Sequence, residues 1–171
     1  MSGYKNFAVV GAGVIGSFII HQLLTEKAAG TVDNVVVLTR QASQAFESTC
    51  QIPFTNLNQP SQGSKTIVDP AANLIPVDYS NKKSIKKALT GVNVVISTVP
   101  ATALDVQPGI AEAAKEAGVK LFAPSEFGVP TEGATDSFFG AKANIHKQLK
   151  AIGIPYALFY TGAFADHVWN T

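Results

Sequence analysis

Cysteine and charge are both scarce in this sequence. Cys50 is the one cysteine, so no disulfide can form within the chain and nothing indicates an oxidising compartment. Charged residues make up 15% of the chain and give a formal net charge of +1. This balance offers no bulk electrostatic reason to expect nucleic acid or an anionic membrane as a partner. We therefore predict a cytoplasmic protein that contacts no nucleic acid directly and no membrane.

Charge is missing altogether from residues 6–25, a run that imitates a signal peptide because Lys5 precedes it. Three glycines at fixed spacing, together with His21 and Gln22, argue against both a signal peptide and a membrane span. A strand, a tight turn and a buried helix account for the same string. Positive charge is instead concentrated in residues 82–87, where four lysines have the spacing of the exposed face of a helix.

The 46% hydrophobic content of 171 residues is enough for one globular domain with a core. Short β-branched runs alternate with helix-like stretches, which is the pattern of a parallel sheet covered on both faces. We predict strands at residues 7–10, 34–38, 74–77, 92–97, 119–123 and 155–160, and helices at residues 14–27, 80–89, 101–117 and 137–152. The polar stretch 41–70 holds only a weak helical signal, around residues 42–48. This order predicts an α/β fold with a doubly wound parallel sheet, the Rossmann fold that binds NAD(P).

Capping residues define several of these helix ends. Ser80 or Asn81 is expected to cap the helix over 80–89. Proline is well placed in a first helical turn, so Pro108 indicates that the helix over 101–117 restarts there. Gly118 and Gly153 are typical C-terminal caps for the last two helices.

Residues 11–16 carry the glycine pattern of a dinucleotide-binding turn, Gly11-Ala12-Gly13-Val14-Ile15-Gly16. The pattern alone is weak, but here it directly follows a predicted strand and opens a predicted helix. Gly11 permits the tight turn, Gly13 lets the backbone approach a pyrophosphate, and Gly16 lets the helix lie close to the strand. The helix N-terminus adds free N–H groups and a partial positive charge. A glycine turn with only a packing role is the alternative.

Arg40 is the one arginine of the chain, and it follows the predicted second strand. NAD-specific Rossmann sites usually hold an acidic residue there, which accepts hydrogen bonds from the ribose 2′-hydroxyl. A carboxylate would repel a 2′-phosphate, whereas a guanidinium can bind it through two charge-assisted hydrogen bonds. Arg40 therefore favours NADP(H) as the cofactor, and a merely solvated arginine is the alternative.

Two further positions follow predicted strands. Asp78 comes after the strand over 74–77, where it would lie beside the adenine or, equally, act as a helix cap or turn residue. Ser97 ends the strand over 92–97 and Thr98 and Val99 follow it, at the carboxyl end where open α/β sheets bind their ligands. The backbone of these residues would line the cofactor cleft, unless they form a plain strand exit. We assign no metal site.

The most specific motif is Pro-Ser-Glu-Phe-Gly at residues 124–128, which follows the glycine turn, Arg40 and Asp78-Tyr79-Ser80 in order along the chain. Together these motifs resemble those of the NmrA-like and isoflavone reductase-like atypical short-chain dehydrogenases. The resemblance implies a dinucleotide-binding Rossmann domain over residues 1–160 and the start of a truncated substrate lobe at residues 161–171. It also implies NADPH-dependent reduction of an aromatic or phenylpropanoid-like small molecule, with Ser125 among the cofactor-binding residues.

The same resemblance implies a catalytic lysine in the helix after Pro-Ser-Glu-Phe-Gly. Lys142 occupies that place and would act as a catalytic base or proton relay. Typical short-chain dehydrogenases use Tyr-x-x-x-Lys instead, and Phe138 excludes that variant here. His146 and Lys147 stand where relatives often have two basic residues.

Three functions remain open from the sequence. The first is an NADPH-dependent oxidoreductase acting on a small-molecule substrate. The second is a non-catalytic NADP(H) sensor of the NmrA type, in which the bound cofactor alters contacts with a protein partner. The third is a truncated product with no independent function, because members of the family that the chain resembles continue past the position of Thr171. Turnover of the cofactor with carbonyl or aromatic ether substrates separates the first two.

Overall fold

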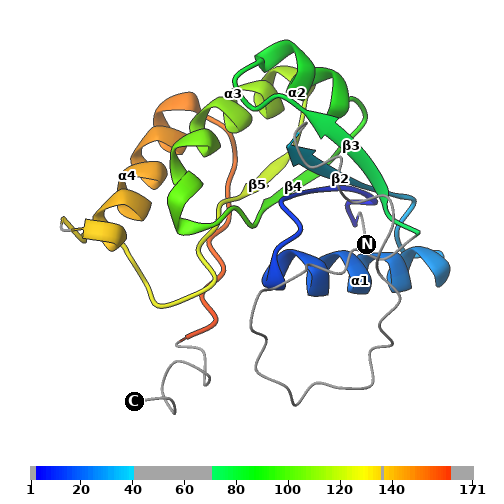
Figure 1. The fold of residues 1–171 in the computed structure, drawn as a ribbon, viewed down its shortest axis with the longest axis horizontal. Helices are drawn as coiled ribbons and strands as arrows, with labels where there is room; N and C mark the ends of the chain where they lie inside the picture. Colours follow the sequence, from blue (N-terminus) through cyan, green and yellow to red (C-terminus); the bar gives the residue numbers. More distant parts are fainter. Residues whose placement is uncertain (1–2, 41–70, 136, 163–171) are drawn as a thin grey trace.

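The computed structural model describes residues 3–40, 71–135 and 137–162. Cys50, the weak helical signal around residues 42–48 and residues 163–171 of the expected start of a substrate lobe lie outside the described residues. The described part of the chain forms a sheet with helices on both faces (Figure 1).

The sheet is parallel and has five strands in the order β3-β2-β1-β4-β5. The strands are β1 (Asn6–Val10), β2 (Asn34–Arg40), β3 (Asn73–Val77), β4 (Val94–Ser97) and β5 (Leu121–Ala123). Val10 at the end of β1 lies opposite Leu38 of β2 on one side and Ser97 of β4 on the other. The chain order reverses between β1 and β4, and doubly wound sheets bind ligands at such a switch point. The predicted doubly wound α/β fold is confirmed.

Helices cover the two faces of the sheet unequally (Figure 1). One face carries α1 (Val14–Ala28), and the other carries α2 (Lys82–Ala88), α3 (Gln107–Ala117) and α4 (Ser137–Ile152). Alternate side chains of each strand point to opposite faces, so Val9 and Val37 pack with Ile20 of α1. Their neighbours Val10 and Leu38 belong to the larger core beneath the other three helices. Burial on both faces explains why the central strands are almost wholly apolar.

The helix ends follow the predicted caps. Asn81 caps α2, and its side-chain oxygen accepts hydrogen bonds from the backbone N–H groups two and three residues further on (3.1 and 3.2 Å). Gly118 after α3 and Gly153 after α4 have φ angles of 84° and 70°, which glycine adopts without strain. The predicted helix over 101–117 is divided, because a 3₁₀ helix η2 (Ala101–Val106) comes first and α3 begins at Gln107 with Pro108 in its first turn.

The predicted strand over 155–160 is wrong as a full strand. This segment pairs with β5 through a single parallel bridge between Phe122 and Tyr156. The next donor of that ladder would be the backbone of Pro124, which has no N–H group. Beyond the interruption, the backbone N–H of Phe127 donates to the carbonyl of Phe159 (2.9 Å). The segment therefore stays beside the loop after β5 without completing a ladder.

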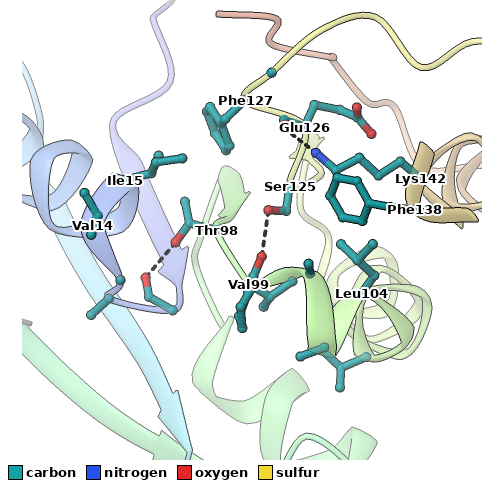
Figure 2. Close-up of a pocket in the computed structure, with 18 of the residues that line it drawn as sticks. Val14, Ile15, Thr98, Val99, Leu104, Ser125, Glu126, Phe127, Phe138 and Lys142 are labelled. Atoms are coloured by element: carbon teal, nitrogen blue, oxygen red, sulfur yellow. Dashed lines mark hydrogen bonds between the residues drawn. The ribbon is translucent and has the colours of Figure 1, made fainter. Parts of the chain in front are cut away.

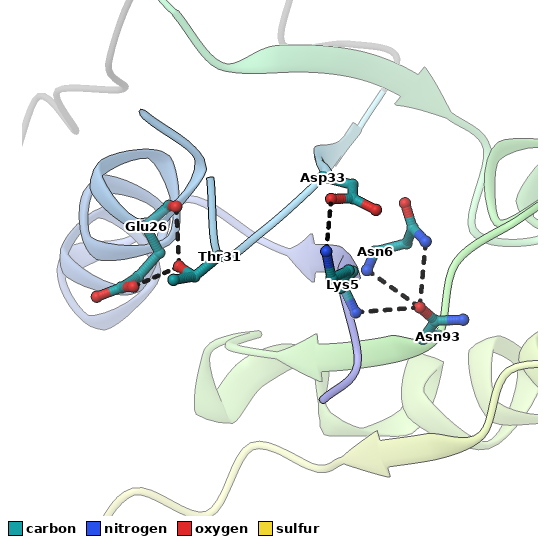
Figure 3. Close-up of polar contacts among 6 residues, drawn as sticks. All are labelled: Lys5, Asn6, Glu26, Thr31, Asp33 and Asn93. Atoms are coloured by element: carbon teal, nitrogen blue, oxygen red, sulfur yellow. Dashed lines mark hydrogen bonds and ion pairs between the residues drawn. The ribbon is translucent and has the colours of Figure 1, made fainter. Parts of the chain in front are cut away.

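The amino-terminal edge of the sheet is fixed by Asn93 (Figure 3). Its side-chain oxygen accepts hydrogen bonds from the backbone N–H groups of Lys5 (3.2 Å) and Asn6 (3.1 Å) and from the amide of Asn6 (3.1 Å). The amine of Lys5 also lies 3.4 Å from the carboxylate of Asp33, just before β2. These contacts join the starts of β1, β2 and β4. The carboxyl ends of the same strands, on the opposite side of the sheet, stay open for a functional site.

The lysines of α2 lie on an exposed helix face, as their spacing predicts. Lys82 pairs with Glu112 (3.1 Å) and Glu116 (2.7 Å) of α3, and Lys86 pairs with Glu116 (3.4 Å). Solvent screens such pairs, so they contribute little to stability. Among the helices of the described residues, none has the length and apolar character needed to cross a membrane.

Candidate functional site

A cavity of about 910 Å³ opens at the carboxyl ends of β1 and β4 (Figure 2). Its wall combines the glycine turn, the end of β2, the exit of β4 with η2, the loop after β5 and the start of α4. The predicted site residues on this wall are Gly11, Ala12, Gly13, Val14, Ile15, Arg40, Thr98, Val99, Ser125 and Lys142. Three other predicted residues do not line it, namely Gly16, Asp78 and Ser97. The structure thus brings most of the predicted site residues to one cavity.

Thr98 closes the glycine turn. Its backbone N–H and its hydroxyl both lie within hydrogen-bond distance of the carbonyl of Val10 (2.8 and 3.1 Å), and the hydroxyl also approaches the carbonyl of Gly11 (2.8 Å). Gly11 has a φ of 90°, which favours glycine. Gly16 packs against Gly11 and Thr98 with no room for a Cβ, whereas Gly13 faces open space. A ligand can therefore approach the backbone at Gly13.

The N-terminus of α1 faces the same turn. The hydrogen bond from the backbone N–H of Ser17 to the carbonyl of Gly13 (2.8 Å) begins the helix, so the N–H groups before Ser17 have no partner within it. The first turn of α1 contains no acidic side chain. Free N–H groups and the partial positive charge of a helix N-terminus suit a phosphate group.

Arg40 ends β2 with an exposed side chain on the cavity wall. Tyr79, which the motifs do not assign to the site, lines the same part of the cavity and donates its hydroxyl hydrogen to the carbonyl of Leu38 (3.0 Å). Burial raises the pKa of Tyr79 to about 12, against a smaller lowering by the charge of Arg40. Tyr79 is therefore neutral at physiological pH and adds no negative charge beside the guanidinium.

Asp78 and Ser97, two of the predicted site residues, lie outside the cavity wall. The carboxylate of Asp78 accepts hydrogen bonds from the hydroxyl (2.6 Å) and the backbone N–H (2.9 Å) of Ser80, and these bonds lower the pKa of Asp78. This geometry is that of a turn residue, which is one of the two roles that the sequence leaves open for Asp78. Ser97 is fully buried in β4, and its hydroxyl has no hydrogen-bond partner among the described residues.

Ser125 holds the loop after β5 against the exit of β4 (Figure 2). Its hydroxyl donates to the carbonyl of Val99 (2.8 Å), and its backbone N–H donates to the side-chain oxygen of buried Gln107 (2.8 Å). The hydroxyl hydrogen of Ser125 is thus already used, so this residue fixes the wall and can only accept a hydrogen bond from a ligand.

Phe127 is the only non-glycine residue with a positive φ among those described, at 38°. Such a backbone is strained by roughly 1–3 kcal/mol and persists only where its surroundings hold it. The hydrogen bond from its N–H to Phe159 supplies part of that hold (2.9 Å), and its ring points into the cavity (Figure 2). The pattern of the sequence carries no signal for this conformation.

Lys142 projects from α4 to the far end of the cavity (Figure 2). The residue is 8% exposed, and its amine donates to the backbone carbonyl of Glu126 (2.5 Å). The amine also lies 4.9 Å from the ring centroid of Phe138, within the range of a cation–π interaction. Burial lowers the pKa of Lys142, and the negative charge of Glu126 opposes that shift in part.

Aromatic residues that the sequence motifs do not assign to the site line the cavity near Lys142. They are Phe127, Phe138 and Phe139. Phe138 matters to the motifs only because it excludes the Tyr-x-x-x-Lys pattern. Their position beside the lysine depends on how α4 packs against the loop after β5, and a sequence pattern does not report that packing.

The fold and the glycine turn define the class of this protein. A doubly wound parallel sheet with a glycine turn at its switch point is a Rossmann-type domain. The chain belongs to the NmrA-like family, whose family model matches residues 4–171. The resemblance inferred from the motifs is therefore confirmed.

The chain is similar to several plant reductases. It is 32% identical to an isoflavone reductase homologue of Arabidopsis thaliana over 98% of this chain and 51% of that protein. It is 35% identical to a phenylcoumaran benzylic ether reductase of Populus trichocarpa over 95% of this chain and 50% of that protein. A solved structure of AtPrR2 with NADP+ and (+)-pinoresinol matches at a TM-score of 0.67 and 23% identity, over 96% of this chain and 52% of that one. The chain thus spans about half the length of the curated relatives it matches.

Proposed function

We propose that this chain carries the cofactor site and the proton-transferring residue of an NADPH-dependent reductase that acts on an aromatic, phenylpropanoid-like small molecule. One observation carries the proposal, namely that a single cavity connects the glycine turn and Arg40 with the buried amine of Lys142. The similarity to an isoflavone reductase homologue and a benzylic ether reductase supports the reductase class.

The residues at one end of the cavity fit NADP(H). The N-terminus of α1 and the open backbone at Gly13 suit a pyrophosphate. The exposed guanidinium of Arg40 at the end of β2 would bind a 2′-phosphate. When bound, NADPH supplies the hydride for the reduction. The similar structure solved with NADP+ supports this cofactor.

Lys142 would handle the proton at the other end. A pKa lowered by burial brings the amine closer to the range in which it can both donate and accept a proton near neutral pH. The carbonyl of Glu126 uses one hydrogen of the ammonium group, which has three, so others remain for a substrate. The ring of Phe138 covers one side of the amine and limits its contact with water.

The cavity wall near Lys142 favours an aromatic substrate. It contains Phe127, Phe138 and Phe139, together with Leu104 and Val129. Apolar and aromatic walls bind planar apolar ligands through burial and ring contacts, and a few polar groups then fix the orientation. The similar structure solved with (+)-pinoresinol supports this class of substrate.

A non-catalytic NADP(H) sensor is the second candidate, and one observation favours it. Val129, Phe138 and Phe139 are 40–42% exposed at the cavity, and exposed apolar side chains grouped together mark surfaces that bind partners. In a sensor, bound cofactor would change the contacts of these side chains with a protein partner.

One experiment separates the two functions. The chain is incubated with NADPH and a set of aromatic ethers and propenyl phenols, and the loss of NADPH absorbance and the products are measured. A reductase forms product, and Lys142→Met lowers its rate by roughly two to four decades, the usual scale of acid–base catalysis. Lys150→Met, an exposed lysine further along α4, serves as the control and should keep the rate. Product formation contradicts the sensor, and absence of NADPH binding contradicts both functions.

A further inference from the structure

Lys142 and His146 lie one helical turn apart on α4, and each is 8% exposed. Both side chains contact Glu126, in the loop after β5. The amine of Lys142 donates to the backbone carbonyl of Glu126 (2.5 Å), whereas Nε2 of His146 lies 2.7 Å from the carboxylate oxygen Oε1. One acidic residue therefore links two basic side chains of the same helix.

The carboxylate of Glu126 is almost completely shielded from water. Glu126 is 3% exposed, and its second oxygen Oε2 accepts a hydrogen bond from the hydroxyl of buried Thr131 (3.0 Å). A buried carboxylate is costly unless hydrogen bonds satisfy it, so both contacts hold the side chain in one orientation. A fixed side chain also limits rotation of the adjoining peptide, whose carbonyl receives the Lys142 amine.

The geometry points to His146 as a positioning residue that holds the amine of Lys142 in place through Glu126. His146 does not line the cavity, so it acts on Lys142 and not on a ligand. Its ring is held in turn by Tyr156, at 6.5 Å between centroids and 21° between planes. The significance of this role for the reaction rests on the proposed function of Lys142 in proton transfer.

Trace acetylation of the 171-residue chain tests the inference without cofactor or turnover. The protein is treated with limiting acetic anhydride, and the labelling of Lys142 is measured by mass spectrometry relative to exposed Lys150. His146→Leu removes the contact with Glu126, whereas His146→Gln keeps a side-chain N–H donor. Lys147→Gln changes an exposed basic residue of the same helix and is the matched control.

We expect His146→Leu to raise the relative labelling of Lys142 by about fivefold, which corresponds to the net contribution of one hydrogen bond. His146→Gln and Lys147→Gln should both stay near the wild-type value, because the donor to Glu126 is kept in both. Wild-type labelling in His146→Leu overturns the inference. Equal increases in the Leu and Gln variants also overturn it, because the hydrogen bond would then not be the cause.

A second pair of variants covers the case in which His146→Leu does not fold, as judged by circular dichroism. Thr131→Val removes the other donor to the Glu126 carboxylate at nearly constant volume, and Thr131→Ser keeps it. The Val variant should raise Lys142 labelling and the Ser variant should not; equal labelling in the two overturns the inference. Absence of NADPH binding would sink the proposed function and leave these labelling results unchanged, so the two failures are distinguishable.

Discussion

Gly16 and Thr98 meet where α1 begins and β4 ends, with no space between them for a side chain. A Cβ on Gly16 would lie 2.6 Å from the hydroxyl oxygen of Thr98 and would also collide with the carbonyl of Gly11. Hydrogen bonds to Val10 and Gly11 fix that hydroxyl, and the carbonyl belongs to the glycine turn itself. Neither neighbour can move without opening the turn.

Gly16→Ala should therefore destabilise the fold by about 1–3 kcal/mol, the usual cost of overpacking. Gly13→Ala is the matched control, because Gly13 has a φ of −70° and nothing within 4 Å of its ideal Cβ position. Urea unfolding of the wild type and both variants measures the difference. Equal unfolding midpoints for the two variants would contradict the close packing of α1 on the turn.

Gly13→Ala should instead weaken cofactor binding in a folded protein. Its added methyl group would occupy the open space through which a pyrophosphate approaches the backbone. We expect a loss in NADPH affinity of roughly tenfold to a hundredfold, equivalent to a steric cost of about 1–3 kcal/mol. Calorimetric titration measures it, with 2′-AMP as the control ligand because it lacks the pyrophosphate. A parallel loss of 2′-AMP binding would indicate a cause other than this contact.

Features that depend only on residues close together in the sequence were predictable from it. The glycine turn, the cap at Asn81 and the left-handed glycine at Gly118 each follow from a short local pattern. The missing ladder after Phe122 was not predictable, because the effect of Pro124 depends on the register with a segment far along the chain. Local chemistry therefore predicted the elements better than it predicted their pairing.

The candidate site divides in the same way. Lys142 was predicted through the family resemblance, but its burial and its contact with Glu126 arise from the packing of α4 on the loop after β5. The positive φ of Phe127 is held by a hydrogen bond to Phe159, so the local sequence does not encode it. Asp78 stayed undecided because a helix cap, a turn and an adenine contact all use the same carboxylate chemistry.

Tyr79→Phe should remove part of the alkaline loss of stability. Burial raises the pKa of Tyr79 to about 12 in the fold, whereas an unfolded tyrosine has a pKa of about 10. The unfolded chain therefore loses this proton first, so the contribution of Tyr79 is complete below pH ~10 and is lost as the pH rises to ~12. At neutral pH, loss of the hydrogen bond to Leu38 should cost about 0.5–1.5 kcal/mol.

Urea unfolding at several pH values measures this dependence. Tyr4→Phe is the control, because Tyr4 is 46% exposed. Tyr160, whose pKa is also raised by burial, keeps its own alkaline slope in both variants. Identical slopes in the Tyr79→Phe variant and the wild type would show that Tyr79 ionises freely in the fold.

Glu126→Gln should lower the pKa of Lys142 further. Burial already lowers this pKa, and the variant removes the opposing negative charge while keeping the side-chain shape. Titration of the ¹³Cε signal of Lys142 in lysine-labelled protein measures the change. An unchanged or raised pKa would contradict the electrostatic effect of Glu126.

The lowered pKa of Lys142 also predicts how stability changes with pH. An unfolded lysine binds its proton more tightly, with a pKa of about 10.4, so the unfolded chain holds more protons between the lowered pKa of the fold and that pH. The contribution of Lys142 to stability therefore rises with pH across this window. Lys142→Met should abolish the rise, and unfolding of both proteins across the alkaline range would show it as a difference in slope.

Arg40 offers the sharpest test of cofactor choice, because its exposed guanidinium ends β2 on the cavity wall beside a neutral Tyr79. A hydrogen bond to a charged group contributes about 1.5–3 kcal/mol, so Arg40→Ala should weaken NADPH binding by roughly tenfold to somewhat over a hundredfold. Arg40→Lys keeps the charge without the planar fork and should lose less.

NADH binding should barely change in Arg40→Ala, because its 2′-hydroxyl carries no charge for the guanidinium to neutralise. Arg40→Asp should reverse the preference, since the new carboxylate repels the 2′-phosphate and accepts a hydrogen bond from the 2′-hydroxyl. Lys27→Ala removes one positive charge at the other end of α1 and controls for net charge. Calorimetric titration of NADPH and NADH against each protein decides the matter: equal affinities in the wild type, or parallel losses for both cofactors in Arg40→Ala, would show that Arg40 does not recognise the 2′-phosphate.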